Sequence, residues 1–225
     1  MESSGTSPSP RTSASGTGVE KPSVSPVLPL LLLETMRDLD RPPEVLEDED
    51  ITTSLPRRLG LSEVVRLQIR RFEQEVRHRR PQIPSQVEDL FRLVIRRPDC
   101  EDIFAAAGRR MAERYWNQRS GVPRTLVRFL PRPLALIAAQ RAGRRMFADL
   151  VGPSPFRISR KPVRLRIDTS LTARADPGGA ACAFYGGAFG ALLELYTGRR
   201  YRILHPACAC RTPGGPCEWS VEIAG

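Results

Sequence analysis

The sequence predicts an α+β domain in which N-terminal helices pack with a small antiparallel sheet and one helix is inserted between the strands. Three observations support this fold class. From about residue 61 to 151, apolar residues recur at helical spacings of three and four. From Phe156 to Ile167, apolar residues alternate with arginine and serine, which is typical of half-buried antiparallel strands. Four of the five cysteines and one of the two histidines gather between positions 182 and 217, which suggests a metal staple.

Residues 1–54 are predicted to form a disordered or linker tail, and the domain is placed at residues 55–225. The first 26 residues are dominated by Ser, Pro, Gly and Thr, a composition that buries little apolar surface. The leucine patch Leu30–Met36 leaves two interpretations, a solvated tail or a short helix that docks on this protein or a partner. The first is favoured, so removal of the tail is expected to leave the stability nearly unchanged.

Five helices and four strands are predicted along the domain, with four helices first and the fifth inserted between the strands. The first helix has an apolar face from Leu61 to Val76, with Ser62 as N-cap and Pro81 beyond its end. The second spans Ser85–Arg97 and the fourth Pro133–Val151. The third begins at Pro98, ends at a break at 121–123, and carries Ile103, Ala107, Met111 and Tyr115 on one face. The later elements are strands through Phe156–Ile158 and Val163–Ile167, a loop at Asp176–Gly179, the inserted helix Cys182–Tyr196, and strands Arg200–Ile203 and Cys217–Ile223 with a turn at Thr212–Gly215.

Charge and cysteine content limit the cellular setting. The chain has a net charge of +10, and almost all of its cationic residues are arginine. No stretch approaches the roughly 20 apolar residues that span a bilayer, and free cysteines without a secretion signal favour a reducing compartment. We therefore expect a soluble cytoplasmic protein, with peripheral membrane association left open. A nucleic-acid partner is not expected, because neither stacking aromatics nor a recognition motif accompanies the arginines.

The candidate metal ligands are Cys182, His205, Cys208, Cys210 and Cys217. Thiolate and imidazole are the ligands that tetrahedral zinc prefers. The alternative is a set of buried cysteines without a metal. Because Cys182 opens a predicted helix, its pKa is expected to be lowered, which would favour its role as a ligand. Cys100 stands apart and is interpreted as a core or cap residue.

The last third of the chain resembles the 4-vinyl reductase domain family. The resemblance lies in Cys182-Ala-Phe-Tyr-Gly-Gly-Ala-Phe-Gly-Ala-Leu-Leu193, then Gly198-Arg-Arg-Tyr201, a later cysteine, and Cys217-Glu-Trp219. It covers roughly Phe156–Ile223 and implies a small-ligand-binding relative of the fold of vesicle-tethering (TRAPP) subunits. The segment Val122–Ala135 is more weakly similar to the bacteriochlorophyll-biosynthesis members of the family.

The resemblance also implies a metal-ligand set. Cys182, Cys208 and Cys217 match the metal-binding cysteines of zinc-containing members, and His205 stands where those members have a carboxylate. Cys210 is an extra thiol, and the sequence leaves open whether it replaces Cys208. Zinc held by four protein ligands would be structural, because the site would be closed.

The function that the resemblance implies is binding of a hydrophobic small molecule, with a bacterial tetrapyrrole precursor of bacteriochlorophyll as the expected ligand and a carrier or accessory role in photosynthetic pigment synthesis. The candidate ligand-binding residues lie on the inserted helix, where they could equally be core: Phe184, Tyr185, Gly187, Phe189, Gly190 and Leu193. One alternative is a true vinyl reductase that needs an electron-donor partner, since the sequence shows no redox cofactor site. Another is a protein-interaction adaptor. Association with a pigment enzyme or with a second copy stays open.

Overall fold

The computed structural model describes residues 23–41, 58–119, 130–151, 156–160, 162–168, 170–212 and 214–223. Over this part of the chain it is an α+β protein, as predicted: the helices pack on one another and cover one face of a four-stranded antiparallel sheet. The predicted break at 121–123 and most of the weakly similar segment 122–135 lie outside the described residues.

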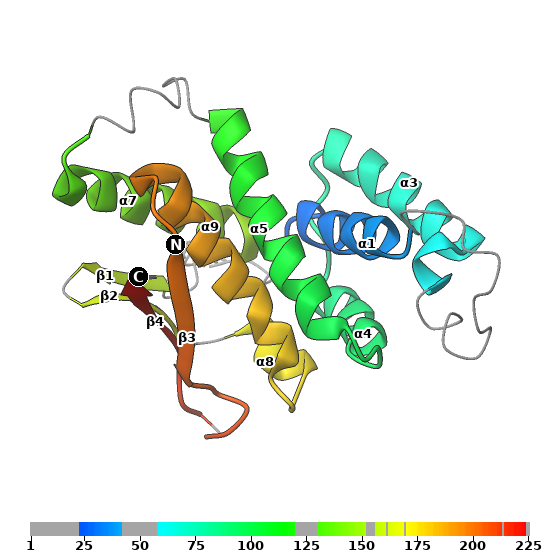
Figure 1. The fold of residues 1–225 in the computed structure, drawn as a ribbon. Helices are drawn as coiled ribbons and strands as arrows, with labels where there is room; N and C mark the ends of the chain where they lie inside the picture. Colours follow the sequence, from blue (N-terminus) through cyan, green and yellow to red (C-terminus); the bar gives the residue numbers. More distant parts are fainter. Residues whose placement is uncertain are drawn as a thin grey trace, which may run out of the picture.

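Two long helices run side by side through the middle of the protein (Figure 1), and the other elements lie on either side of them. The helices are α1 (Val27–Leu39), η1 (Arg58–Leu61), α3 (Glu63–Arg77), α4 (Pro84–Val94), α5 (Cys100–Arg119), α7 (Arg132–Val151), α8 (Leu171–Ala175), η2 (Ala180–Cys182) and α9 (Ala183–Thr197). The central pair is α5 and α9. The helices α1, α3 and α4 lie on one side of α5, and α7 and the sheet lie on the other side of the pair.

The sheet has the order β1-β2-β4-β3, which the sequence alone did not predict. Its strands are β1 (Phe156–Arg160), β2 (Val163–Ile167), β3 (Tyr201–Ala207) and β4 (Cys217–Ile223). The last strand enters between β2 and β3, so Leu165 lies opposite Trp219 and Ile167 opposite Cys217. The predicted alternation is confirmed, because Ile158, Leu165 and Ile167 are buried, whereas Arg157, Arg164 and Arg166 are exposed.

The glycines of α9 allow this helix to be enclosed on two sides. A side chain at Gly187 would overlap the carbonyl oxygen of Ala105 on α5, so the two backbones touch there. On the opposite side, a Cβ at Gly186 would lie 3.4 Å from the indole of Trp219, and one at Gly190 would lie 3.0 Å from Ile203. α9 is therefore sandwiched between α5 and the sheet.

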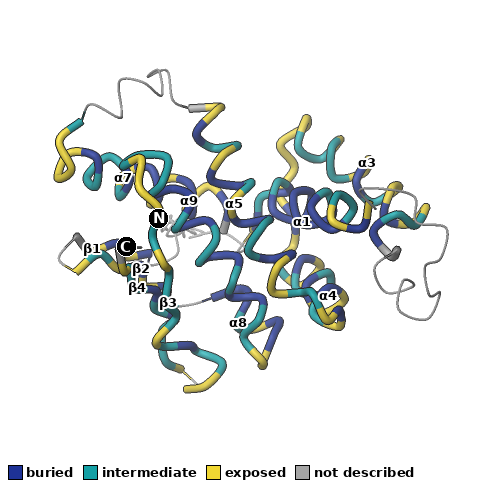
Figure 2. Tube along the Cα trace, viewed as in Figure 1, coloured by how far each residue is buried: buried dark blue, intermediate teal, exposed yellow. Residues whose placement is uncertain are grey.

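The predicted tail is wrong for α1. Leu28, Leu32 and Met36 are at most 2 % exposed, and the helix is buried along much of its length against α3 and α5 (Figure 2). Asp40 at its C-terminal end receives two hydrogen bonds from Arg97, at 2.7 and 2.9 Å, and one from the backbone N–H of Gly60 at 2.6 Å. The domain thus begins before residue 55, because the leucines that looked like tail residues fill its core.

The other predicted helices are confirmed with small shifts of their ends. Ser62 caps α3 by accepting a hydrogen bond from the Val65 N–H at 3.3 Å. The short helix α8 was not predicted, because its five residues are too few to show a period. Strand β3 continues past its predicted end at Ile203 to Ala207, and this extension places His205 on the strand.

Candidate metal centre and adjoining cleft

Four side chains converge at the point where η2 meets the sheet. Cys182, His205, Cys208 and Cys217 each offer one ligand atom, and these atoms all lie within 4.8 Å of one another. The Sγ atoms of Cys182 and Cys217 lie 3.9 and 4.0 Å from that of Cys208. Sulfur ligands about 2.3 Å from a tetrahedral ion are separated by about 3.8 Å. The two sulfur separations are thus close to those of a metal site, and the four residues could hold a metal ion.

Local structure brings these residues together. The loop before η2 is closed by Asp176, whose carboxylate accepts hydrogen bonds from the N–H groups of Gly178 and Ala181 at 2.8 and 2.7 Å. Gly179 then takes a φ of 85°, which a glycine adopts without strain. This turn delivers the thiol of Cys182 to the sheet.

The remaining two thiols come from the chain around the β3–β4 connection. Cys208 follows β3 directly and begins a turn in which its carbonyl oxygen accepts from the N–H groups of Arg211 and Thr212 at 3.0 and 3.1 Å. Cys217 opens β4, and its Sγ accepts a hydrogen bond from the Ala209 N–H at 3.4 Å. The turn thus places one backbone donor at a sulfur, which stabilises a thiolate.

The electrostatics of the cluster favour one thiolate. The pKa of Cys217 is lowered because this thiol accepts a hydrogen bond from Cys182, an effect to which His205 and the Ala209 N–H add. The same hydrogen bond, together with burial, raises the pKa of Cys182. The expectation that a helix N-terminus lowers the pKa of Cys182 is therefore wrong in the absence of an ion. The hydroxyl of Thr172, 3.2 Å from the Cys182 Sγ, is a further hydrogen-bond partner.

His205 provides the clearest sign of a missing partner. Its Nε2 is buried and has no hydrogen-bond partner among the described residues. A buried polar atom without a partner costs free energy, so such atoms are rare in native proteins. The imidazole stacks on the indole of Trp219 with ring centroids 4.6 Å apart and an interplanar angle of 1°. The donor set fits a metal ion, and the unsatisfied Nε2 shows that the imidazole lacks one partner.

The two other cysteines lie outside the four-residue set. Cys210 stands in the turn after β3, and its Sγ lies 3.1 Å from the carbonyl oxygen of Asp176. Burial, followed by the contact with Cys208, raises its pKa to about 12. Cys100 is half-buried at the start of α5, in agreement with a core or cap role. The structure therefore favours Cys208 over Cys210 as the ligand.

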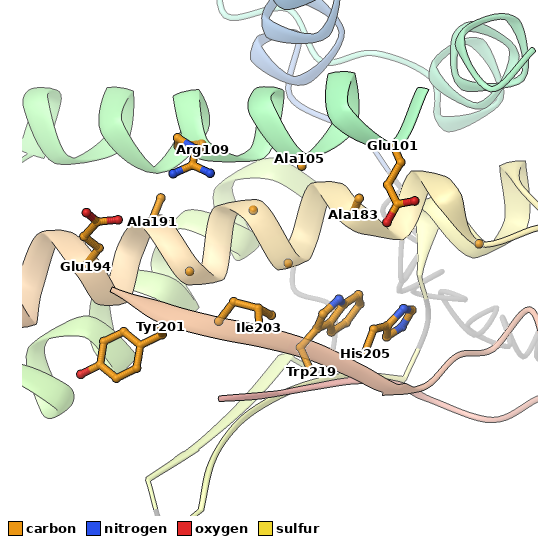
Figure 3. A pocket seen from close by; sticks show the side chains of 14 residues that line it. Glu101, Ala105, Arg109, Ala183, Ala191, Glu194, Tyr201, Ile203, His205 and Trp219 are labelled. Carbon is orange, nitrogen blue, oxygen red and sulfur yellow. The ribbon is translucent and has the colours of Figure 1, made fainter. Parts of the chain in front are cut away.

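A cleft of about 310 Å³ opens beside the cluster, between α5, α9 and the edge strand β3. Its lining includes Ala105 and Arg109 from α5, the three glycines of α9, and Ile203, His205 and Trp219 from the sheet. In Figure 3, His205 and Trp219 lie side by side on the strands below α9, and Arg109 lies above on α5. His205 thus belongs to the cleft and to the metal-ligand set at once.

The predicted ligand-binding residues divide into two groups. Gly187 and Gly190 line the cleft. Phe184, Tyr185, Phe189 and Leu193 are at most 2 % exposed and belong to the core instead of the cleft wall. Their side chains pack in the core around α9. Phe184 and Tyr185, for example, form an aromatic pair with ring centroids 5.5 Å apart.

Sequence reasoning missed the cleft residues of the sheet and of α5. Tyr201, Ile203 and His205 alternate along β3 and so share one face, which would have been visible had the strand been extended to His205. Trp219 stands two residues after the candidate ligand Cys217 and therefore lies on the same face of β4. No sequence signal marked Thr172, and Arg109 was only the first of a run of arginines that extends to Arg145, because only the fold brings these two residues near the site.

No protein-family model, curated protein or solved structure matches this chain. Among the described helices, none combines the length and the apolar character needed to cross a bilayer.

Proposed function

We propose that this protein binds a hydrophobic small molecule in the cleft beside a structural zinc site. The observation that carries the proposal is the shared position of His205, which joins a four-residue metal-ligand set to the wall of a cleft. Clefts that hold small molecules have volumes of roughly 300–1,000 Å³ and are lined mainly by apolar groups with a few polar ones. The cleft here, at about 310 Å³, lies at the lower end of this range.

Zinc is the ion that suits the ligand set best. Three thiols and one imidazole are soft and borderline donors, which select zinc over magnesium or calcium. Four protein ligands close the coordination sphere, so the ion would hold η2, β3 and β4 together and would leave no position for a reacting water molecule.

The lining of the cleft indicates the chemistry of the ligand. The glycines of α9 with Ala183 and Ala191 form a low apolar wall, and Ile203 and Trp219 form the facing one. At the rim, Arg109 has no ion-pair partner among the described residues, whereas Arg110 beside it pairs with Asp38 at 2.7 Å. Two carboxylates, those of Glu101 and Glu194, also line the cleft, and Glu194 pairs with Arg200 at 3.4 Å. A flat apolar molecule complements the two walls, and a carboxylate on it would have to lie at Arg109 and away from these acids.

A tetrapyrrole intermediate of bacteriochlorophyll synthesis is the ligand we propose, on the strength of the resemblance to the 4-vinyl reductase domain family. Such a pigment is flat and apolar and bears a carboxylate at one edge. Since the cleft is small and open on one side, it would hold one edge of the macrocycle. The role is then that of a carrier or accessory factor in pigment synthesis.

Titration with divinyl chlorophyllide, followed by absorption spectroscopy, tests this function. The protein is expected to shift the spectrum of the pigment and to produce no reduced pigment when nicotinamide cofactors are added. The ester that masks the pigment carboxylate is expected to bind several-fold more weakly, and Arg109→Gln is expected to remove that difference. Arg157→Gln is the matched control, because Arg157 lies on the exposed face of β1 and carries the same charge.

Each other outcome has a definite meaning. Reduction of the 8-vinyl group by the protein alone would replace the carrier with a reductase. Failure of the zinc-loaded protein to bind any tetrapyrrole would overturn the proposed ligand and would favour an adaptor that binds another protein.

A further inference from the structure

The stacked pair of His205 and Trp219 connects the metal-ligand set to the cleft. His205 is a member of the set, and its ring lies parallel to the indole at a centroid distance of 4.6 Å. Both residues line the cleft (Figure 3). A change in the position of the imidazole therefore alters the wall of the cleft through its stacking contact with the indole of Trp219.

The indole of Trp219 is closely packed, so a movement of the imidazole is transmitted to it. Trp219 is 1 % exposed, and its Cδ1 and Nε1 atoms lie 3.4 Å from the position that a Cβ on Gly186 would take. The other neighbouring ring is Tyr185, with centroids 5.5 Å apart. The indole is thus held between the backbone of α9 on one side and the imidazole on the other.

The imidazole, in contrast, has no hydrogen-bond partner at Nε2 among the described residues. A bond from one of its nitrogens to a metal ion would fix the ring, because metal coordination is directional and the three thiol sulfurs lie within 4.8 Å of its ligand atom. The ring then sets the plane of the indole that stacks on it.

We propose that Trp219 is a positioning residue through which the metal ion sets the affinity of the cleft for its ligand. This inference rests on the proposed function, because it assigns a regulator to the same cleft. The metal-loaded centre holds His205, His205 holds Trp219, and Trp219 completes the wall that the ligand contacts. Linkage makes the effect reciprocal, so a ligand in the cleft stabilises the bound ion by the same factor.

The first test uses the intact zinc-loaded protein and needs no metal-free form. The affinity for zinc is measured by equilibrium competition with a chromogenic chelator, with and without saturating divinyl chlorophyllide. We expect the pigment to raise the affinity for zinc about 5-fold or more, the lower end of common coupling strengths. In Trp219→Leu, which keeps all four metal ligands, the pigment should no longer change the affinity for zinc. Cys210→Ser, which changes a thiol outside the set, should behave as the unaltered protein. An equal affinity for zinc with and without bound pigment would overturn the proposal.

The second test needs no pigment and so separates this proposal from the proposed ligand. Trp116→Phe leaves Trp219 as the only tryptophan and keeps an aromatic ring against Tyr196, which Trp116 contacts at a centroid distance of 4.7 Å. Loading the chelated protein with Zn²⁺ is expected to shift Trp219 emission, because the imidazole stacked on the indole is then fixed, with an unchanged far-ultraviolet circular dichroism spectrum. If the emission does not respond to Zn²⁺, the proposal is wrong. If it responds but no tetrapyrrole binds, the proposed ligand fails while the link between metal and cleft wall stands.

Discussion

The two ends of the domain are held together by different forces. The α1 end consists of α1, α3, α4 and the Asp40–Arg97 pair. Buried leucines supply most of its contacts, and the buried ion pair joins the C-terminal end of α1 to the segment between α4 and α5. At the metal end, made of η2, the close of β3 and the start of β4, three thiols and an imidazole face one another instead. Apolar packing is spread over many side chains, whereas the metal end depends on one cluster.

This difference determines how each end fails. Removal of one leucine leaves the remaining packing of the α1 end in place, because dispersion and hydrophobic burial are shared among many contacts. The metal end has no such reserve, since without an ion the His205 nitrogen is unpaired and Cys182 keeps a proton that coordination would displace. The predictions below separate the two ends, from the largest effect to the smallest.

Loss of α1 should have the largest effect. Deletion of residues 1–41 would expose the faces of α3 and α5 that α1 covers, and we expect no cooperatively folded protein by thermal unfolding. A point substitution sharpens this result: Leu32→Ala, at a residue 1 % exposed, should lower the free energy of unfolding by about 2–5 kcal/mol. Leu39→Ala on the same helix is the control, because Leu39 is 50 % exposed and should change stability little. Equal effects of the two would contradict the buried position of α1.

Chelation of the metal should weaken the metal end by several kcal/mol and leave the α1 end nearly unchanged. Binding of a structural ion adds to the folding free energy, so its removal is felt where the ligands lie. Hydrogen exchange should accelerate in β3, β4 and η2, while the amides of α1 and α3 stay protected. Because Cys182 must lose a proton to bind the ion and its pKa is raised, metal affinity should also increase with pH. Uniform acceleration along the chain would show that the two ends are not separable.

Much of this architecture follows from the sequence, and the exceptions have physical causes. The cap at Ser62, the alternation from Phe156 to Ile167 and the gathering of thiols at one site depend on local spacing, which a sequence displays directly. The burial of α1 does not, since its leucines are followed by Pro42, Pro43 and an acidic run and resemble a tail until the groove they fill is known. The same holds for the cleft, because aromatic residues on α9 suit a binding wall and a core equally well.

The buried ion pair at the α1 end should matter less than α1 as a whole. The side chains of Asp40 and Arg97 are 1 % and 3 % exposed, so Asp40→Ala would remove both carboxylate oxygens that accept hydrogen bonds from the buried guanidinium. A loss of about 3–5 kcal/mol is expected in chemical denaturation. Asp38→Ala provides the contrast, because that carboxylate is 32 % exposed and its pair with Arg110 should contribute at most about 1 kcal/mol. If both substitutions lower the free energy of unfolding equally, the buried Asp40–Arg97 pair contributes no more to stability than an exposed pair.

The smallest effect is expected at the glycines of α9. Gly187→Ala places a methyl group against the Ala105 carbonyl, a backbone atom that cannot move aside, and should cost about 1–3 kcal/mol despite the higher helix propensity of alanine. Gly190→Ala meets only the flexible side chain of Ile203 at 3.0 Å and should be nearly neutral. Thermal unfolding of the two variants in parallel would show whether α9 is clamped by α5 or only by the sheet. A larger loss at Gly190 would contradict the clamp by α5.

The metal content of the purified protein tests the central claim most directly. Protein isolated under reducing conditions and analysed by mass spectrometry of its metals should contain about one zinc ion per chain, as a closed four-ligand site holds. Cys182→Ser and Cys217→Ser should lose this ion, whereas Cys210→Ser and Cys100→Ser should retain it. Folded protein without any metal, or full retention of zinc in Cys217→Ser, would contradict the assignment of these four residues.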